Sequence, residues 1–100
     1  MTSTADHVRA HLRLSGRVQG VGFRYATADE ARQRHLGGWV RNVESGGVEA
    51  VFEGPLESVQ AMLHWCQQGP PGAWVRDLKV VWDEPLEHLR QFDIRPSALY

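Results

Sequence analysis

The stretch GRVQGVGFR, residues 16–24, combines three glycines with an arginine, and these residue types suit the binding of an anion. Glycine tolerates positive φ and lets the backbone approach a ligand closely. Inward-facing N–H groups in such a loop form a concave anion site, to which a following helix adds its own unpaired N–H groups. Arg24, on the first turn of that helix, can hold two oxygens of a phosphate at once. The stretch therefore predicts a phosphate-binding loop.

The predicted phosphate-binding residues are the whole loop and its closing arginine: Gly16, Arg17, Val18, Gln19, Gly20, Val21, Gly22 and Arg24. The alternative is an ordinary glycine-rich turn followed by a solvated arginine, which is common between a strand and a helix. The stretch fits neither the GxxxxGK[ST] nor the GxGxxG pattern, so it does not indicate nucleotide binding.

Length and composition predict one small globular domain. The chain has 100 residues, of which 42% are hydrophobic and 23% charged, enough to fold without metal or disulfide. A net charge of −1 provides no long-range field for nucleic acid or an anionic membrane, so any anion site must be local. A single cysteine, Cys66, fits a reducing compartment. Without a long apolar run or signal peptide, we expect a cytoplasmic monomer.

The order of the predicted elements is βαββαβ followed by a short last strand. The first predicted strand begins at Ala10, and the other four cover 39–42, 48–53, 78–83 and 92–94. The first predicted helix covers 23–34. The second follows Gly54-Pro55 and ends at a break at 67–72. This order is typical of an α+β, ferredoxin-like βαββαβ sandwich, with an antiparallel sheet and two helices on one face. We expect a frayed tail at 1–8, the domain at 9–96 and a C-terminal tail at 97–100.

Asn42, at the end of the segment GWVRN, is the second candidate for the site. We expect its strand to lie beside the first strand, which would bring Asn42 to the same sheet edge as the glycine loop. A carboxamide can accept a hydrogen from water and donate to an oxygen, and so can position a nucleophile. The alternative is a turn residue that bonds its own backbone. Arg41 should point to the opposite face, so only one of the two can share the site.

GRVQGVGFR followed by GWVRN, with FDIRPS near the end of the chain, resembles the acylphosphatase family over nearly the whole chain. The resemblance implies hydrolysis of carboxyl-phosphate anhydrides to carboxylate and inorganic phosphate, without metal or cofactor. Matching motif to motif, it assigns phosphate binding to residues 16–22 and Arg24, and catalysis to Arg24 and Asn42, with Asn42 orienting the attacking water. The implied partners are an acyl phosphate and phosphate, with neither nucleic acid nor membrane.

One segment departs from the family pattern. A Leu-Gly-Leu-x-Gly run usually precedes the GWV motif, whereas this chain has Arg34-His35-Leu36-Gly37-Gly38. His35 then occupies the left-handed position that glycine normally takes at a helix end. The departure concerns the helix end and its stability rather than the catalytic pair.

Other reactive residue types are interpreted as structural. The histidines match no metal-ligand spacing, Cys66 lies on the apolar stripe of the second helix, and the tryptophans are assigned to packing, with Trp39 also a candidate to line the site. The rival function is a non-catalytic ferredoxin-like module that binds an anion or RNA, but the third strand, VEAVFE, lacks an exposed aromatic pair. A third hypothesis is the acylphosphatase-like domain of a larger carbamoyl-transferring protein, and we expect a stand-alone enzyme instead.

Overall fold

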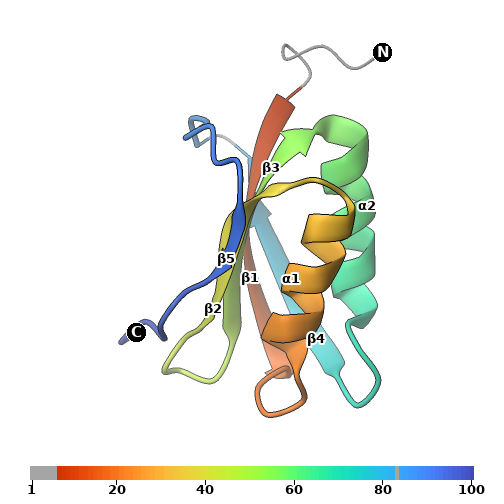
Figure 1. Ribbon diagram of the computed structural model, residues 1–100. Helices are drawn as coiled ribbons and strands as arrows, with labels where there is room; N and C mark the ends of the chain where they lie inside the picture. Colours follow the sequence, from red (N-terminus) through yellow and green to blue (C-terminus); the bar gives the residue numbers. More distant parts are fainter. Residues whose placement is uncertain (1–6, 83) are drawn as a thin grey trace.

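A computed structural model describes residues 7–82 and 84–100, and its elements follow the predicted order (Figure 1). They are β1 (His7–Arg17), α1 (Phe23–Gln33), β2 (Gly37–Asn42), β3 (Val48–Pro55), α2 (Leu56–Gln68), β4 (Trp74–Val81) and β5 (Phe92–Ile94). Figure 1 shows both helices against one face of the sheet, as the ferredoxin-like prediction requires.

The five strands lie in the order β4-β1-β3-β2-β5. All neighbours are antiparallel except β2 and β5, which pair in parallel. The four main strands are therefore antiparallel as predicted, and the short last strand, for which the sequence predicted no direction, makes the sheet mixed. The connection after β4 explains this direction. The chain stays at the end of the sheet where β4 finishes, and β5 starts there. β5 is therefore antiparallel to β4 and parallel to β2.

The strand neighbours of β1 also differ from expectation, because β3 lies between β1 and β2. β1 and β2 are each antiparallel to β3 and therefore run in the same direction. In register, Leu14 of β1 and Asn42 of β2 both lie opposite Val48. The end of β2 thus reaches the same sheet edge as the loop after β1, although the two strands are not adjacent.

The hydrophobic core lies between the sheet and the helices. The two helices contribute Phe23, Thr27, Ala28 and Ala31 from α1 and Val59, Met62 and Cys66 from α2. Cys66 is fully buried, and burial raises the pKa of its thiol far above the usual range, which fits its assignment as a core residue. Within the described residues, no helix has the length and apolar character needed to cross a membrane.

Three predicted boundaries need correction. Residues 1–6 of the predicted N-terminal tail lie outside the described residues, but His7 and Val8 belong to β1 and pair with β3. Strand β4 begins at Trp74 rather than 78, because a register shift opposite Ser15 and Gly16 breaks its alternation. Asp83, in the same predicted strand, lies outside the described residues.

The third correction concerns the predicted C-terminal tail, which packs against the sheet instead. The Ala98 N–H donates to the Asn42 carbonyl over 3.0 Å, and the Tyr100 hydroxyl donates to Glu49 Oε1 over 2.6 Å. Each of these contacts involves a single residue of the C-terminal segment. The sequence therefore has no hydrophobic periodicity there that would predict packing against the sheet.

The sheet face that the helices leave open carries a network of charged side chains. Glu49 lies at its centre, with its side chain 5% exposed, and it contacts His11 Nε2 at 2.6 Å, Arg41 Nε at 2.8 Å and Tyr100 Oη at 2.6 Å. Burial alone would raise the pKa of the Glu49 carboxyl, but these hydrogen bonds together outweigh it and hold the pKa below its usual value. The network therefore joins β1, β2 and the C-terminus through one carboxylate.

The end of α1 has the geometry expected from the sequence. His35 has φ of 57°, which confirms the predicted left-handed conformation. Its N–H donates to the Arg32 carbonyl and the Leu36 N–H to the Ala31 carbonyl, the paired bonds of a Schellman motif. A side chain at this position is strained, since glycine is the residue that adopts it at no steric cost.

Acid should weaken the fold through Glu49. Because the pKa is lower in the folded state, the stabilisation is present above the unfolded value of about 4.3 and is lost as pH falls through the folded value. Glu49→Gln should reduce the free energy of unfolding by about 3 kcal/mol at pH 7, and the difference from wild type should narrow at pH 3. Urea unfolding at both pH values tests this, with exposed Glu57→Gln as control; an equal difference at both would contradict it.

Removing the strain at His35 should stabilise the protein. His35→Gly should raise the free energy of unfolding by about 1 kcal/mol, which corresponds to a rise in Tm of about 4–8 °C for a domain of this size. Gln33→Gly, in the last turn of α1, is the matched control and should lower the Tm, because a right-handed helical position disfavours glycine. Thermal unfolding of both variants decides; a lower Tm for His35→Gly would show that its side chain has a stabilising contact.

Candidate functional site

The glycine loop connects the end of β1 to the start of α1. Gly20 and Gly22 have φ of 76° and 75°, so both adopt the left-handed conformation that the sequence predicted for this loop. Gly22 is also the N-cap of α1, and no side chain caps the helix there. The first N–H groups of α1 thus lack the side-chain partner that often satisfies them.

The backbone N–H groups of the loop are also without protein partners. Within residues 7–82 and 84–100, no N–H group from 18 to 22 donates a hydrogen bond to the protein. Buried or ordered N–H groups normally find an acceptor. A run of free donors beside an uncapped helix start is the arrangement that binds phosphate and related anions.

The side chain of Gln19 holds the loop against the turn that follows β2. Its Nε2 atom donates to the carbonyl oxygens of Val43 and Gly47, each at 2.8 Å. Sequence reasoning assigned Gln19 to phosphate binding, but its carboxamide nitrogen is engaged in this tether. Val18, next to it, is 1% exposed and anchors the loop in the core. The loop is therefore fixed beside the end of β2.

Arg24 follows the tethered loop, and Asn42 directly precedes the turn to which the loop is bound. Arg24 is the second residue of α1 and is partly buried, and within the described residues no carboxylate pairs with it. Its guanidinium carbon lies 5.9 Å from the ring centre of Tyr25. Figure 1 shows the start of α1, the glycine loop and the turn after β2 at one end of the molecule.

The carboxamide of Asn42 retains an unused acceptor. Its Oδ1 atom is buried and accepts no hydrogen bond from the described residues, whereas its backbone carbonyl accepts one from Ala98. An unpartnered buried acceptor is uncommon, because leaving it unpaired costs about 1–3 kcal/mol. The alternative of a turn residue bonded to its own backbone does not account for Oδ1.

Arg41 faces away from Asn42, which confirms the prediction from strand alternation. Its Nε pairs with Glu49 Oε1 at 2.8 Å on the open face of the sheet. Trp39 is on that same face, with the guanidinium carbons of Arg41 and Arg95 at 4.6 and 4.7 Å from a ring centre. Trp39 is therefore a packing residue of the charged network, and Arg41 is bound within that network.

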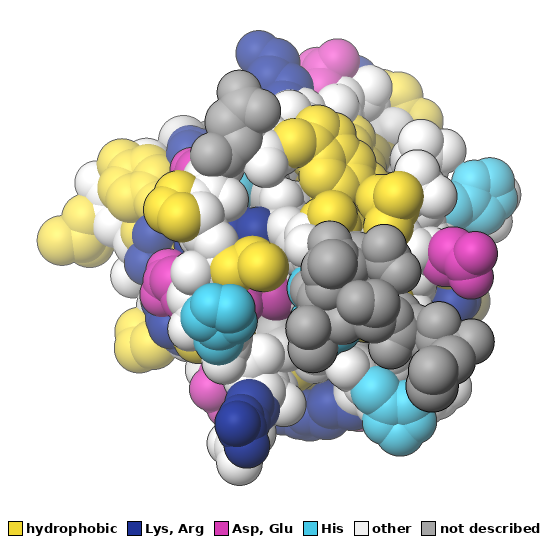
Figure 2. Space-filling model, turned by 90° about the horizontal axis from the view of Figure 1, so that it is seen from above, with side chains coloured by type: hydrophobic (Ala, Val, Ile, Leu, Met, Phe, Trp, Pro, Cys, Tyr) yellow, Lys and Arg dark blue, Asp and Glu magenta, His cyan; other side chains and the backbone are white. Residues whose placement is uncertain are grey.

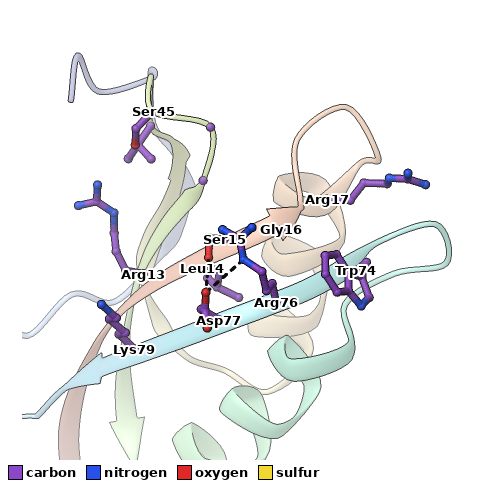
Figure 3. Close-up of a pocket in the computed structure, with 13 residues that line it drawn as sticks. Arg13, Leu14, Ser15, Gly16, Arg17, Ser45, Trp74, Arg76, Asp77 and Lys79 are labelled. Atoms are coloured by element: carbon purple, nitrogen blue, oxygen red, sulfur yellow. Dashed lines mark hydrogen bonds and ion pairs between the residues drawn. The ribbon is translucent and has the colours of Figure 1, made fainter.

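Sequence reasoning missed a group of residues beside the loop. The lining of a hollow includes Arg13, Trp74, Arg76 and Lys79, together with Gly16 and Arg17, the last two residues of β1 before the loop (Figure 3). A basic residue alternating with apolar ones is an ordinary signal of a solvated strand face, so the pattern did not single them out. Among the described residues, no cluster of three or more His, Cys, Asp or Glu side chains is placed to hold a metal ion.

The fold is that of a ferredoxin-like α/β domain, and the sheet edge beside α1 carries a glycine loop whose N–H groups are free. The acylphosphatase family model matches residues 10–94. The chain is 52% identical over 94 residues to an acylphosphatase of Nostoc, covering 94% of this chain and 92% of the relative. It is 54% identical over 87 residues to an acylphosphatase of Thermococcus kodakarensis, covering 87% and 94%. The chain belongs to the acylphosphatase family.

Solved structures agree with this assignment. The crystal structure of acylphosphatase from Bacillus subtilis matches with a TM-score of 0.85 and 39% identity, covering 88% of this chain and 98% of that one. A full-length HypF structure in its phosphate- and nucleotide-bound form matches with a TM-score of 0.85 and 26% identity, but this chain spans only 12% of it. The same domain fold thus occurs within a much longer protein.

The tether of Gln19 should control how well the loop binds an anion. Gln19→Ala removes two hydrogen bonds, so the free energy of unfolding should fall by about 1–3 kcal/mol. Inorganic phosphate should bind more weakly, because the loop loses its fixed position. Calorimetric titration with phosphate checks this, with exposed Gln60→Ala on α2 as control. Wild-type phosphate affinity in Gln19→Ala would show that the tether does not order the loop.

Proposed function

We propose that this chain hydrolyses acyl phosphates to a carboxylate and inorganic phosphate at the loop between β1 and α1. The observation that carries the proposal is the free donor set: loop N–H groups, an uncapped helix start and Arg24 at one sheet edge. Membership of the acylphosphatase family supports the choice of reaction. The acyl phosphate and phosphate are the partners, and both candidate residues come from one chain, so a monomer suffices.

Arg24 and the loop bind the phosphoryl group in this proposal. The N–H groups set the positions of the oxygens, and the guanidinium supplies charge and can bond two oxygens at once. Because Arg24 has no carboxylate partner within the described residues, its charge is not already neutralised by the protein. Donors held in place before the reaction stabilise the charge that develops in the transition state.

Asn42 positions the attacking water. Its buried Oδ1 accepts a hydrogen from the water, which turns a lone pair of the water oxygen toward phosphorus. The water attacks phosphorus as the bond to the carboxylate oxygen breaks, and the electron pair of that bond leaves with the carboxylate. Fixing water and phosphoryl group in line removes most of the entropic part of the barrier.

The chemistry suits a site with few groups. A carboxylate is a good leaving group, so the reaction needs no strong general acid. Neither motif contains a carboxylate or histidine, and we propose that an oxygen of the substrate's phosphoryl group takes the water's proton. The residues of the chain then supply binding, charge and alignment without a metal or cofactor. The buried free Cys66 is consistent with a cytoplasmic location.

The two candidate residues should fail in different ways. Arg24→Ala should lose phosphate affinity and lower kcat/KM for benzoyl phosphate by about 100-fold or more, because it removes charge from ground and transition states alike. Asn42→Ala should keep phosphate affinity and lower kcat by a similar factor. The assay contains a chelator, and phosphate binding is measured separately by titration.

Matched controls are Arg24→Lys, which keeps the charge but loses the two-point contact, and Arg41→Gln on the opposite face. Full activity in Asn42→Ala would refute the water-positioning role. Phosphate binding by wild-type protein without hydrolysis of any acyl phosphate would favour the non-catalytic anion-binding module instead.

A further inference from the structure

A hollow of about 710 Å³ opens beside the glycine loop, on the sheet face that the helices leave uncovered (Figure 3). It is lined by the last residues of β1, the first residues of β4 and the turn after β2. Its lining includes Gly16 and Arg17, the last two residues of β1 before the loop, and Val43, the residue after Asn42. A ligand held by the loop therefore has this hollow as its immediate neighbour.

The hollow is basic although the chain is not. Arg13, Arg17, Arg76 and Lys79 line it together with one carboxylate, Asp77, whereas the whole chain has a net charge of −1. Asp77 pairs with Arg76 at 3.2 Å. Within the described residues, the other three basic side chains have no carboxylate partner. The positive charge is thus concentrated locally and makes no direct ion pair at these three side chains, although Glu49 and Glu84 line an adjoining hollow with Arg13 and Lys79.

Two of these basic residues face each other across neighbouring strands. Arg13 of β1 and Lys79 of β4 are partners in register, and Figure 3 shows both side chains at the same side of the hollow. Like charges directly opposite each other, as Arg13 and Lys79 are, destabilise a sheet. The guanidinium carbon of Arg13 lies 5.0 Å from the ring centre of Tyr100, which accounts for Arg13 but not for Lys79 opposite it. An anion between the two side chains would offset their repulsion. At the opposite end of the molecule, basic and acidic side chains are scattered among hydrophobic and histidine side chains (Figure 2).

An aromatic side chain completes the hollow. Trp74, at the start of β4, is 61% exposed and takes no part in the core. A large exposed ring beside a charged hollow provides an apolar surface for the carbon skeleton of a ligand.

We propose that this hollow binds the acyl group of the substrate and favours acyl groups that carry a second anionic group, which Arg13 and Lys79 hold. The inference rests on the proposed hydrolysis at the loop and names the class of acyl phosphate that it prefers. With the phosphoryl group in the loop, the acyl carbons lie along Trp74 and the distal anion lies between the two basic side chains. Arg13 and Lys79 bind substrate away from the reacting bond, so they set specificity.

Two substrates that differ by one charge test the proposal: benzoyl phosphate and 4-carboxybenzoyl phosphate. The measured quantity is the ratio of their kcat/KM values in wild type, in Lys79→Gln, in the double variant Arg13→Gln/Lys79→Gln and in the control Arg90→Gln. Arg90 is exposed and lies outside the hollow, so its variant changes net charge without touching the site.

The double variant should lower the ratio about fivefold, the effect expected from two exposed ion pairs, and the change should be in KM. Arg90→Gln should leave the ratio unchanged. The preference should also shrink at high salt. A ratio that is the same in wild type and the double variant, with both substrates hydrolysed, overturns this inference alone. Failure of wild type to hydrolyse either substrate overturns the proposed function and this inference with it.

Discussion

The tether from Gln19 to the turn after β2 is the interaction on which the rest of the site depends. A loop that contains Gly20 and Gly22 has little conformational preference of its own, and its N–H groups bind an anion only when they converge. Two hydrogen bonds of 2.8 Å to Val43 and Gly47 fix the loop beside Asn42. The donors of one motif and the carboxamide of the other are thereby brought to one edge.

The register of the sheet also fixes where Asn42 lies relative to the loop. Leu14 and Asn42 lie opposite the same residue of β3, so β2 ends level with Leu14, and β1 continues from there to Arg17 and the loop. On the open face, Glu49 joins these strands to the C-terminus through His11, Arg41 and Tyr100. The charged network takes no part in the reaction we propose, but it joins the strands that position the site.

Sequence reasoning identified the elements and the site motifs because each has a local signal. Glycines with positive φ, the apolar stripe of α2 and the left-handed His35 all depend on neighbouring residues in the chain. What it missed depends on pairing between distant segments. The parallel β5 follows from where a long connection returns, and the true start of β4 was hidden by a register shift.

The same distinction holds within the site. The loop and Asn42 belong to motifs that can be read directly, but the role of the Gln19 side chain depends on a turn 24 to 28 residues away. Asn42 reaches the sheet edge of the loop as expected, although the assumed strand neighbour was wrong, because β1 and β2 run in the same direction and Leu14 and Asn42 lie opposite the same residue of β3. Arg13 and Lys79 became a pair only through the register of β1 with β4.

The central claim is that the loop N–H groups and Arg24 converge on a phosphoryl dianion. Titration of isotope-labelled protein with inorganic phosphate, followed by amide NMR, tests it most directly. The claim predicts saturable shifts centred on residues 18–22 and on the Arg24 guanidinium, with a common dissociation constant. Shifts centred elsewhere, or no saturable change in the loop, would contradict it.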